Sequence, residues 1–386
     1  MIAALFWTSL ALIAYVYAIY PLLIAGLAKA RPRVPAPEFP EGAWPHIAVL
    51  IPASNEERWI ARKIENTLAL DYPPGKLRVV VASDGSSDRT YEIALEYSAR
   101  GVEGIQFPRC LGKQEVLNRL IPQLAEDVVL LTDANALLDP SAARRMVRHF
   151  ADSRTGCVAG RRVCAVQRRS ASSVGESLYW RYESWIKSSE SRVHSATCAD
   201  GQIFAVRRAA VSCVRQGGED FVIPMAMVAR GFRFIFEPEA VAIVPAASEL
   251  APEFRRKVRS HVSFLLNAWL MRRLLIPRRS PVWWQLLSHH VLRMTVPPAM
   301  LLAFLAGASL AASSSFYRAP FFAQSFFYGC AAAGFFLARR GLRPKIFYVP
   351  FYFVFAQLAL AVAWWRWARG RREFAWQRTD RLLDPS

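Results

Sequence analysis

The hydrophobic residues of this chain gather near its two ends. Residues 2–28 contain no charged side chain, and basic residues follow at once at Lys29, Arg31 and Arg33. About 20 apolar residues suffice for a helix to cross a bilayer. We therefore predict a transmembrane helix over residues 1–29 rather than a signal peptide, because no basic segment precedes the apolar run and the run is too long. The basic residues behind it predict a cytoplasmic domain next in the chain.

Three further uncharged stretches of crossing length follow near the C-terminus, at residues 295–317, 319–338 and 346–365. They predict a membrane region over residues 295–366, followed by a basic tail over residues 367–386. The short basic segment at residues 339–345 is expected on the cytoplasmic side. Three crossings from a cytoplasmic domain would place the C-terminus outside, whereas the basic tail favours the cytoplasm. The pattern leaves the side of the C-terminus open.

Between these ends the pattern changes to short apolar runs that alternate with helical stretches. Runs of strand length occupy residues 46–52, 77–82 and 128–132, and the segment before them, residues 30–44, is a Pro-rich linker. Apolar strands alternating with helices predict a mostly parallel sheet covered on both faces. We therefore expect an α/β, Rossmann-like domain over residues 45–249.

Polar residues follow each of these predicted strands. Asp84 and Asp133 are the first carboxylates after the second and third strands, and Asn135 follows two positions later. Ligands of parallel sheets bind outside the carboxyl ends of the strands, so the two carboxylates are expected to converge. Such a pair suits a hard cation with oxygen ligands, Mg²⁺ or Mn²⁺. The alternative for residues 86–88 is ordinary helix capping.

Seven short blocks follow one another along the chain, at residues 50–57, 82–88, 112–118, 132–135, 200–208, 218–220 and 231–240. Together they resemble glycosyltransferase family 2, the inverting nucleotide-sugar transferases with a Rossmann-like fold that include polysaccharide synthases. The resemblance extends over essentially the whole chain, since the tail at residues 376–381 also resembles a W-x-x-T-x-R element of related membrane transferases. It implies a donor that is a nucleotide sugar, with UDP as the commonest nucleotide.

The resemblance implies roles for the residues of these blocks. The nucleotide would be bound by Pro52, Ser54, Glu56, Asp84, Lys113 and Asp133. Asp133 stands at the first position of the family's D-x-D metal motif, and Asn135 replaces the second acidic residue. Its amide oxygen can still bind Mg²⁺ or Mn²⁺, or it contacts the nucleotide instead. The acceptor would lie beside Gly201, Gln202, Ile203 and Phe204.

The resemblance also implies that Asp220 is the catalytic base, with Glu219 in support. A sugar hydroxyl is a poor nucleophile, so a carboxylate must take its proton as it attacks the anomeric carbon. A single displacement of this kind inverts the anomeric configuration. The alternative is that Glu219 and Asp220 form an exposed acidic turn after Gly217 and Gly218.

The Q-x-x-R-W motif of processive synthases is not intact. At the corresponding place the chain has Arg256, Arg259 and Ser260, so the Arg is kept and the Gln and Trp are not. Without the Trp a stacking face for a growing polymer is missing, which disfavours processive polymerisation. Arg256 and Arg259 are candidates for contact with the donor diphosphate, or alternatively with anionic headgroups.

Residues 250–294 join basic and apolar side chains. From residue 250 to residue 293 there are nine basic residues and one acidic residue, Glu253, interleaved with Leu and Trp. This composition predicts helices that lie in the membrane interface and bind anionic lipids. His289 and His290 are expected at the level of the headgroups.

The whole-chain totals fit this division. The net charge is +19 and 53% of the residues are hydrophobic, but the basic residues concentrate beside the membrane segments. A nucleic-acid-binding protein would instead carry them on the soluble domain. The six cysteines show no metal-ligand spacing and are expected as reduced, buried thiols of a cytosolic domain.

The sequence therefore predicts an integral protein of the inner or plasma membrane with a cytoplasmic catalytic domain. It would move a sugar from a nucleotide sugar to a lipid-linked or cell-envelope glycan acceptor. Two alternatives stay open. One is a processive exopolysaccharide synthase, and the other transfers sugar to polyprenyl phosphate, whose anionic nucleophile needs a base less.

Overall fold

The structure, a computed structural model, describes residues 1–32, 37–40, 42–165, 172–212, 217–245, 250–342 and 344–370, with the backbone alone for residues 172–177. At its centre lies an eight-stranded sheet with the order β3-β2-β1-β4-β7-β6-β8-β5. The strands are β1 (Ile47–Ala53), β2 (Leu77–Asp84), β3 (Val102–Phe107), β4 (Val128–Leu131), β5 (Leu137–Leu138), β6 (Thr155–Ala165), β7 (Phe204–Arg207) and β8 (Arg233–Pro245). The first four strands in this order pair in parallel, and β7 and β5 pair antiparallel to their neighbours.

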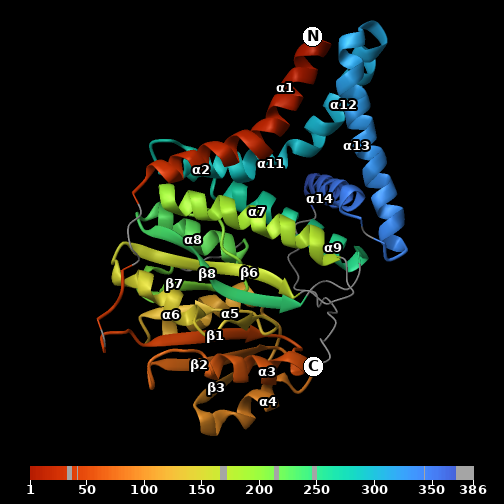
Figure 1. The fold of residues 1–386 in the computed structure, drawn as a ribbon. Coiled ribbons are helices and arrows are strands. Elements are labelled where there is room, and N and C mark those ends of the chain that lie inside the picture. Colours follow the sequence, from red (N-terminus) through yellow and green to blue (C-terminus); the bar gives the residue numbers. More distant parts are fainter. Residues whose placement is uncertain are drawn as a thin grey trace.

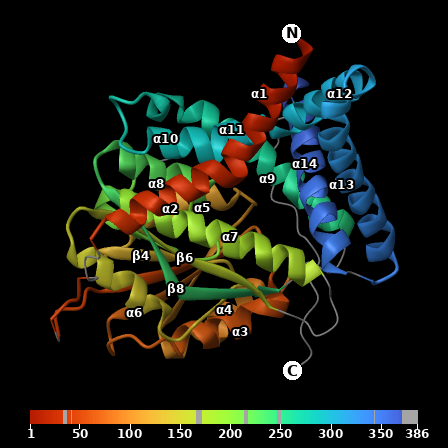
Figure 2. The ribbon, with the colours of Figure 1, turned by 45° about the horizontal axis from the view of Figure 1, so that its top comes forward.

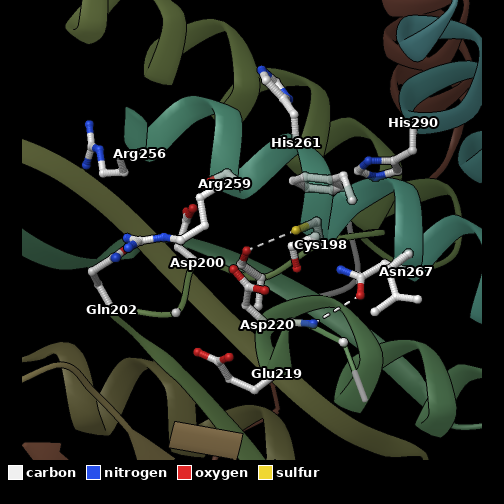
Figure 3. Close-up of a pocket in the computed structure, with 18 of the residues that line it drawn as sticks. Cys198, Asp200, Gln202, Glu219, Asp220, Arg256, Arg259, His261, Asn267 and His290 are labelled. Carbon is white, nitrogen blue, oxygen red and sulfur yellow. Dashed lines mark hydrogen bonds between the residues drawn. The ribbon is translucent and has the colours of Figure 1, made fainter. Parts of the chain in front are cut away.

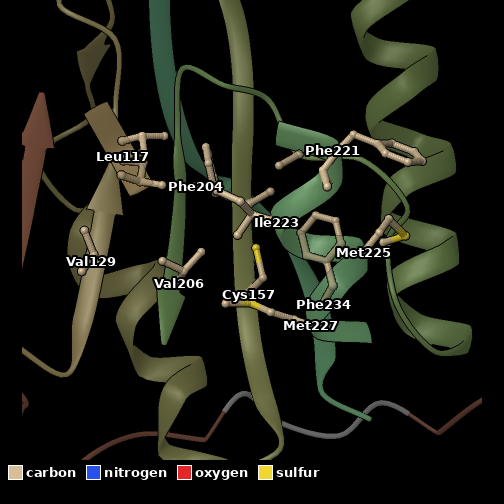
Figure 4. Close-up of a cluster of buried hydrophobic side chains, with 14 of the residues drawn as sticks. Leu117, Val129, Cys157, Phe204, Val206, Phe221, Ile223, Met225, Met227 and Phe234 are labelled. Carbon is tan, nitrogen blue, oxygen red and sulfur yellow. The ribbon is translucent and has the colours of Figure 1, made fainter. Parts of the chain in front are cut away.

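Alternating side chains of β1 build two hydrophobic cores, because successive residues of a strand point to opposite faces. Ala48 and Leu50 belong to one core, and Ile47, Val49 and Ile51 belong to the other. The first core also takes residues of α5 (Lys113–Leu120) and α8 (Glu219–Ala229), such as Leu117 and Phe221 (Figure 4). The second takes residues of α3 (Glu57–Leu68) and α6 (Ala142–Val147). The sheet is therefore covered on both faces, as its apolar strands predict.

Further helices pack around the sheet domain or lie between it and the apolar ends of the chain. The two long helices among them are α7 (Ser172–Val193) and α9 (Leu250–Leu270). The short helix α4 (Thr90–Glu96) lies beside β3. The short α, 3₁₀ and π turns are η2 (Ser98–Arg100), η3 (Ile121–Gln123), η4 (Arg148–Ala151), η5 (Arg208–Ala210), η6 (Arg272–Leu275), α10 (Trp283–Gln285), η7 (Leu286–Val291) and α11 (Leu292–Met294).

Four helical segments in the described part of the chain are long and apolar enough to cross a membrane: Ile2–Ala30, Val296–Ser313, Ser315–Arg339 and Lys345–Ala368. The last three are α12, α13 and α14. They match the one N-terminal and three C-terminal helices expected from the sequence, so the predicted fold class is confirmed. The tail motif at residues 376–381 and parts of the linker, residues 33–36 and 41, lie outside the described residues.

The N-terminal segment is not one straight helix. It divides into α1 (Ile2–Ala14), a π-helical turn η1 (Tyr15–Ile19) and α2 (Tyr20–Ala30). Helix α2 lies along α7 on the sheet domain, whereas α1 projects away from the domain beside α12 (Figures 1 and 2). The bend falls at the π-helical turn, a feature that a run of apolar residues does not reveal.

Candidate functional site

A cavity of about 860 Å³ opens beside the carboxyl ends of the parallel strands. Its walls come from the loop before α5, the end of β4, residues 198–202, the first turn of α8, and α9 with the histidines of η7 (Figure 3). The predicted residues Lys113, Asp133, Asp220 and Glu219 all line this cavity. The edge of the sheet and the elements after residue 250 thus line the same cavity. No single sequence motif indicates that these two parts of the chain lie together.

Asp220 lies in the first turn of α8, which begins directly after Gly218. The amide of Ala199 donates to the Asp220 carbonyl at 2.8 Å, and Asn267 on α9 accepts the Gly218 amide at 3.0 Å. Burial, followed by the charges of Glu219 and Asp200, raises the pKa of Asp220 to about 7, against the opposing effect of Lys113. A carboxylate with this pKa is matched to proton abstraction near neutral pH.

Lys113, the first residue of α5, holds several parts of the cavity together. Its Nζ lies 2.7 Å from Asp133 Oδ1 and 2.7 Å from Glu219 Oε1, and it donates to the Gly201 carbonyl at 3.2 Å. Burial opposes its charge, but the two carboxylates outweigh burial and raise the pKa of Lys113. Lys113 is therefore a fixed cation between the end of β4 and the head of α8.

Asp133 follows β4 and is supported from both sides. Gln202 Nε2 donates to Asp133 Oδ2 at 3.2 Å. Beneath it the fully buried Lys63 donates to Thr132 Oγ1 at 2.9 Å and to the Ala136 carbonyl at 2.5 Å, on either side of the loop that carries Asp133. Sequence reasoning missed Lys63. Its place between Ile60 and Ile64 on the apolar face of an amphipathic helix was an available signal.

The residues around Asp133 fit a divalent cation in part. Asp133 offers a carboxylate, and the buried Oδ1 of Asn135 has no hydrogen-bond partner among the residues that the structure describes. Those residues contain no group of three or more His, Cys, Asp or Glu side chains placed to hold a metal ion. Asp133 lines the cavity and Asn135 does not, so the carboxylate of Asp133 is the ligand that faces the space. A Mg²⁺ or Mn²⁺ ion there would take most of its other ligands from a diphosphate and water.

The other predicted nucleotide-binding residues form the edge of the sheet next to the cavity. Asp84 is fully buried and accepts the amides of Leu111 and Gly112 at 2.7 and 2.9 Å, while Ser54 Oγ donates to the Asp84 carbonyl at 3.0 Å. Asp84 therefore anchors the loop that leads into α5. Its carboxylate does not line the cavity, in contrast to Asp133, so the two predicted strand-end carboxylates do not face one ion.

Close backbone packing explains the glycine beside Asp84. Gly85 has φ of +59°, and a Cβ atom there would lie 2.2 Å from the Cys110 amide nitrogen. Pro52 lies in β1, one residue before its end. Glu56 stands just before α3, and its amide donates to Thr90 Oγ1 at 2.8 Å. Neither Pro52 nor Glu56 lines the cavity.

The predicted acceptor segment divides into two parts. Gly201 and Gln202 line the cavity. The side chains of Ile203 and Phe204 are fully buried in the two hydrophobic cores on opposite faces of the sheet, so they support the segment rather than face a ligand.

Helix α9 closes the cavity over Asp220. Arg256, Arg259 and Ser260 all line it, which agrees with their alignment to one motif. Burial and then the charge of Arg256 lower the pKa of Arg259. Two guanidinium groups that repel each other at a cavity wall favour an anion between them.

His289 and His290, expected at the level of the headgroups, face the inside of the protein. Both line the cavity, and His289 is 2% exposed. The two ring nitrogens of His289 lie 2.8 Å from Glu190 Oε1 and 3.1 Å from Glu183 Oε2, and Glu183 pairs with Arg293 at 2.6 Å. His289 is thus held by carboxylates on α7, and His290 Nε2 lies 2.8 Å from Thr197 Oγ1. The sequence pattern of residues 250–294 does not indicate these distant partners.

The prediction for the cysteines holds in part. Cys157, Cys164 and Cys198 are buried free thiols of the domain, whereas Cys110 is exposed and Cys330 lies in the apolar helix α13. Cys213 lies outside the described residues.

Comparison with known proteins adds an independent finding. The model of the family described as glycosyltransferase like family 2 matches residues 45–262. The chain is 27% identical over 236 residues to an N-acetylglucosaminyltransferase of Mesorhizobium japonicum, covering 56% of this chain and 55% of that protein. It is 27% identical over 224 residues to a poly-β-1,6-N-acetyl-D-glucosamine synthase of Staphylococcus aureus, covering 55% and 53%. The chain thus spans about half the length of the curated relatives it matches.

Another relative is a β-monoglucosyldiacylglycerol synthase of Trichormus variabilis, 28% identical over 166 residues, covering 42% of this chain and 35% of that protein. Among solved structures, a mannosyltransferase from Pyrobaculum calidifontis in complex with GDP-Man and Mn²⁺ superposes with a TM-score of 0.69 at 22% identity. It covers 94% of this chain and 98% of the other. This likeness confirms the fold.

Proposed function

The chain belongs to glycosyltransferase family 2, and we propose that it transfers a sugar from a nucleotide sugar, with UDP as the first nucleotide to test, to a hydroxyl of a lipid-linked or cell-envelope glycan acceptor. The observation that carries this proposal is the half-buried carboxylate of Asp220, with a pKa raised to about 7, in a cavity that also contains the Lys113–Asp133 pair. A base and a cationic donor site stand in one enclosed space.

In the proposed mechanism Asp220 takes the proton of the acceptor hydroxyl while the hydroxyl oxygen attacks the anomeric carbon. The bond from that carbon to the diphosphate oxygen breaks, and the nucleoside diphosphate leaves from the opposite side. The configuration is therefore inverted. Glu219 is paired with Lys113 at 2.7 Å, which leaves Asp220 as the better candidate for the base.

The departing diphosphate develops negative charge, which Lys113 and the Arg256–Arg259 pair would stabilise. Asp133 and Asn135 would hold Mg²⁺ or Mn²⁺. When bound, such an ion supplies Lewis-acid stabilisation of the diphosphate. The solved mannosyltransferase was obtained with GDP-Man and Mn²⁺, which supports a nucleotide sugar and a divalent ion as the first ligands to test.

We propose that the four apolar helical segments hold the protein in the inner or plasma membrane, with the catalytic domain in the cytoplasm and anionic lipids against residues 250–294. The exposed leucines of α2, among them Leu22 and Leu27, support this placement, because they lie on the outside of a helix that packs on the domain. An acceptor carried by a lipid would meet the cavity at this side.

Two other acceptors are kept as alternatives. One relative is a poly-β-1,6-N-acetyl-D-glucosamine synthase, which favours a growing polymer as the acceptor and therefore a processive enzyme. Ser260 at the cavity wall disfavours it, because a serine offers no stacking face for the end of a polymer. Transfer to polyprenyl phosphate would start from an anionic nucleophile, for which the raised pKa of Asp220 has no use.

The test incubates membranes that carry the full chain with a panel of radiolabelled nucleotide sugars and Mg²⁺ or Mn²⁺. Lipid-extractable and polymeric products are counted separately, and membranes with Asp220→Asn are the control. Label in lipid extracts with wild type alone supports the proposal. Long polymers would favour the processive alternative, and equal transfer by Asp220→Asn would remove the base from the mechanism.

A further inference from the structure

A buried polar network joins the N-terminal helix to the wall of the cavity. Tyr20 and Glu190 are both fully buried, and Tyr20 Oη donates to Glu190 Oε1 at 2.6 Å. The second oxygen of this carboxylate, Glu190 Oε2, accepts the hydroxyl of the buried Thr197 at 2.9 Å. His289 completes the set at 2.8 Å from Glu190 Oε1. Glu190 on α7 is thus held by an apolar N-terminal helix on one side and by the segment before the active site on the other.

The segment that Glu190 holds leads directly to the reacting groups. Residues 198–202 line the cavity immediately after Thr197, and the Ala199 amide donates to the Asp220 carbonyl at 2.8 Å. Gln285 Nε2 donates to the carbonyls of Glu190 and Ser195 at 3.2 and 3.0 Å, which fixes the start of the same segment. A shift of Glu190 would therefore be transmitted over a few covalent bonds to the backbone that positions Asp220.

The network lies where the two π-helical turns of the structure meet. Residues 15–19 and 286–291 are both π-helical, and π turns inside helices occur often at functional sites. The Tyr20 and Trp284 rings contact each other edge to face at 5.1 Å. Next to them Tyr15 accepts a hydrogen bond from Trp284 Nε1 at 2.9 Å and lies 2.8 Å from Ser288 Oγ. An anchor needs none of these directed polar contacts.

We propose that the N-terminal helix is a positioning element of the catalytic site, in which Tyr20 holds Glu190 and thereby fixes residues 197–201 against Asp220. This role rests on the proposed function, since it concerns the base of that reaction. It makes Tyr20 a positioning residue, because its hydroxyl acts on Asp220 through Glu190, Thr197 and Ala199. The apolar helix would thus serve transfer directly, in addition to holding the protein in the membrane.

The test compares two single hydroxyl deletions on this helix in the full chain, purified in detergent. Tyr20→Phe removes the contact with Glu190, and Tyr15→Phe removes a hydroxyl with two hydrogen bonds that do not involve Glu190. We expect Tyr20→Phe to lower kcat by about three- to tenfold, because small misplacement of a catalytic group is costly. Its KM for the donor should stay unchanged, and the acid limb of its pH–rate profile should move. Tyr15→Phe should keep the wild-type kcat and acid limb.

A second pair covers the case in which Tyr20→Phe fails to fold. Thr197→Val removes the hydroxyl on the other side of Glu190, which also lies 2.8 Å from His290 Nε2, and Ser288→Ala is its control. Amide hydrogen exchange of residues 197–201 should accelerate in Tyr20→Phe and Thr197→Val and in neither control. Equal kcat, acid limb and exchange in Tyr20→Phe and Tyr15→Phe would overturn this role. Failure of the wild type to transfer any sugar would instead refute the proposed function, and the exchange measurement does not depend on transfer.

Discussion

The two walls of the cavity differ in how the chain builds them. The sheet-side wall comes from Lys113 and Asp133, each next to an element that a short motif predicts. The membrane-side wall comes from α7, α9 and η7, which are joined by contacts between distant segments, such as Glu190 and His289 at 2.8 Å. The side chains of the sheet-side wall are set by short stretches of sequence. The side chains of the membrane-side wall are set by which helices, distant in the sequence, pack together. Asp220, the proposed base, stands between the two walls and is held by residues of both.

The largest effect should come from removing that base. Asp220→Asn keeps the size of the side chain and cannot accept a proton, so we expect kcat to fall by about 10²- to 10⁴-fold. Glu219→Gln, the neighbouring change in the same helical turn, should cost less because Glu219 is paired with Lys113. Steady-state transfer to the acceptor measures both. A larger loss for Glu219→Gln than for Asp220→Asn would exchange their roles.

The pH dependence tests the electrostatics of Asp220. Burial and Glu219 raise its pKa to about 7, so the active, ionised form is lost below this pH and kcat/KM should fall about tenfold per pH unit. Glu219→Gln removes one of the raising charges and should move this acid limb to lower pH. A limb that moves upward in Glu219→Gln would contradict the assigned cause.

The free energy of unfolding should depend on pH in the opposite sense to activity. Because the folded-state pKa of Asp220 lies above the unfolded value of about 3.9, its contribution to stability is complete at acid pH and is lost as pH rises through about 7. Asp220→Asn stays neutral, so it should melt at a higher temperature than the wild type at pH 8. Melting of both proteins in the same detergent, at pH 5 and pH 8, checks this sign.

The sequence predicted the sheet-side wall well because its information is local. Buried apolar strands followed by Asp84 and Asp133 placed polar groups at one edge of a parallel sheet, and the sheet has that arrangement. Lys63 was missed because a lysine is read as an exposed residue, although its position on the apolar face of α3 was visible. Ile203 and Phe204 were placed by motif, and strand alternation sent their side chains into the cores instead.

The membrane-side wall could not be predicted to the same depth. The composition of residues 250–294 correctly suggested amphipathic helices, and α9 does pack on the apolar helix α14. Composition does not reveal that Glu183 and Glu190 on α7 would bury His289, nor that a π turn would bend the N-terminal helix at Tyr15. Pairing between segments so far apart depends on the whole fold, so periodicity within either segment contains no signal for it.

Lys63 allows the sheet-side wall to be weakened from below. Lys63→Met keeps the length of the side chain and leaves the Thr132 hydroxyl and the Ala136 carbonyl without their buried donor. We expect a loss of roughly 1–3 kcal/mol per unsatisfied group in the free energy of unfolding, and weaker donor binding as the Asp133 loop loosens. Lys76→Met, which removes a lysine with two carbonyl partners near the surface, is the matched control. Equal melting temperatures for the two variants would show that the buried Lys63 Nζ does not support the loop.

The smallest expected effect concerns Asn135. Asn135→Asp adds a carboxylate where the buried amide oxygen has no partner among the described residues. Without a divalent ion the new charge is costly to bury, so the variant should melt below the wild type in chelator. With Mn²⁺ it should regain that loss and bind the ion a few-fold more tightly, as electron paramagnetic resonance of free Mn²⁺ would measure. Because both readouts are taken without substrate, they report on the ion alone. Destabilisation that Mn²⁺ does not reverse would show that residue 135 does not contact the ion. Asn135 would then be a candidate for contact with the nucleotide instead. Asp133 would be left as the single protein ligand of a metal site for which the sequence predicted two, Asp133 and Asn135.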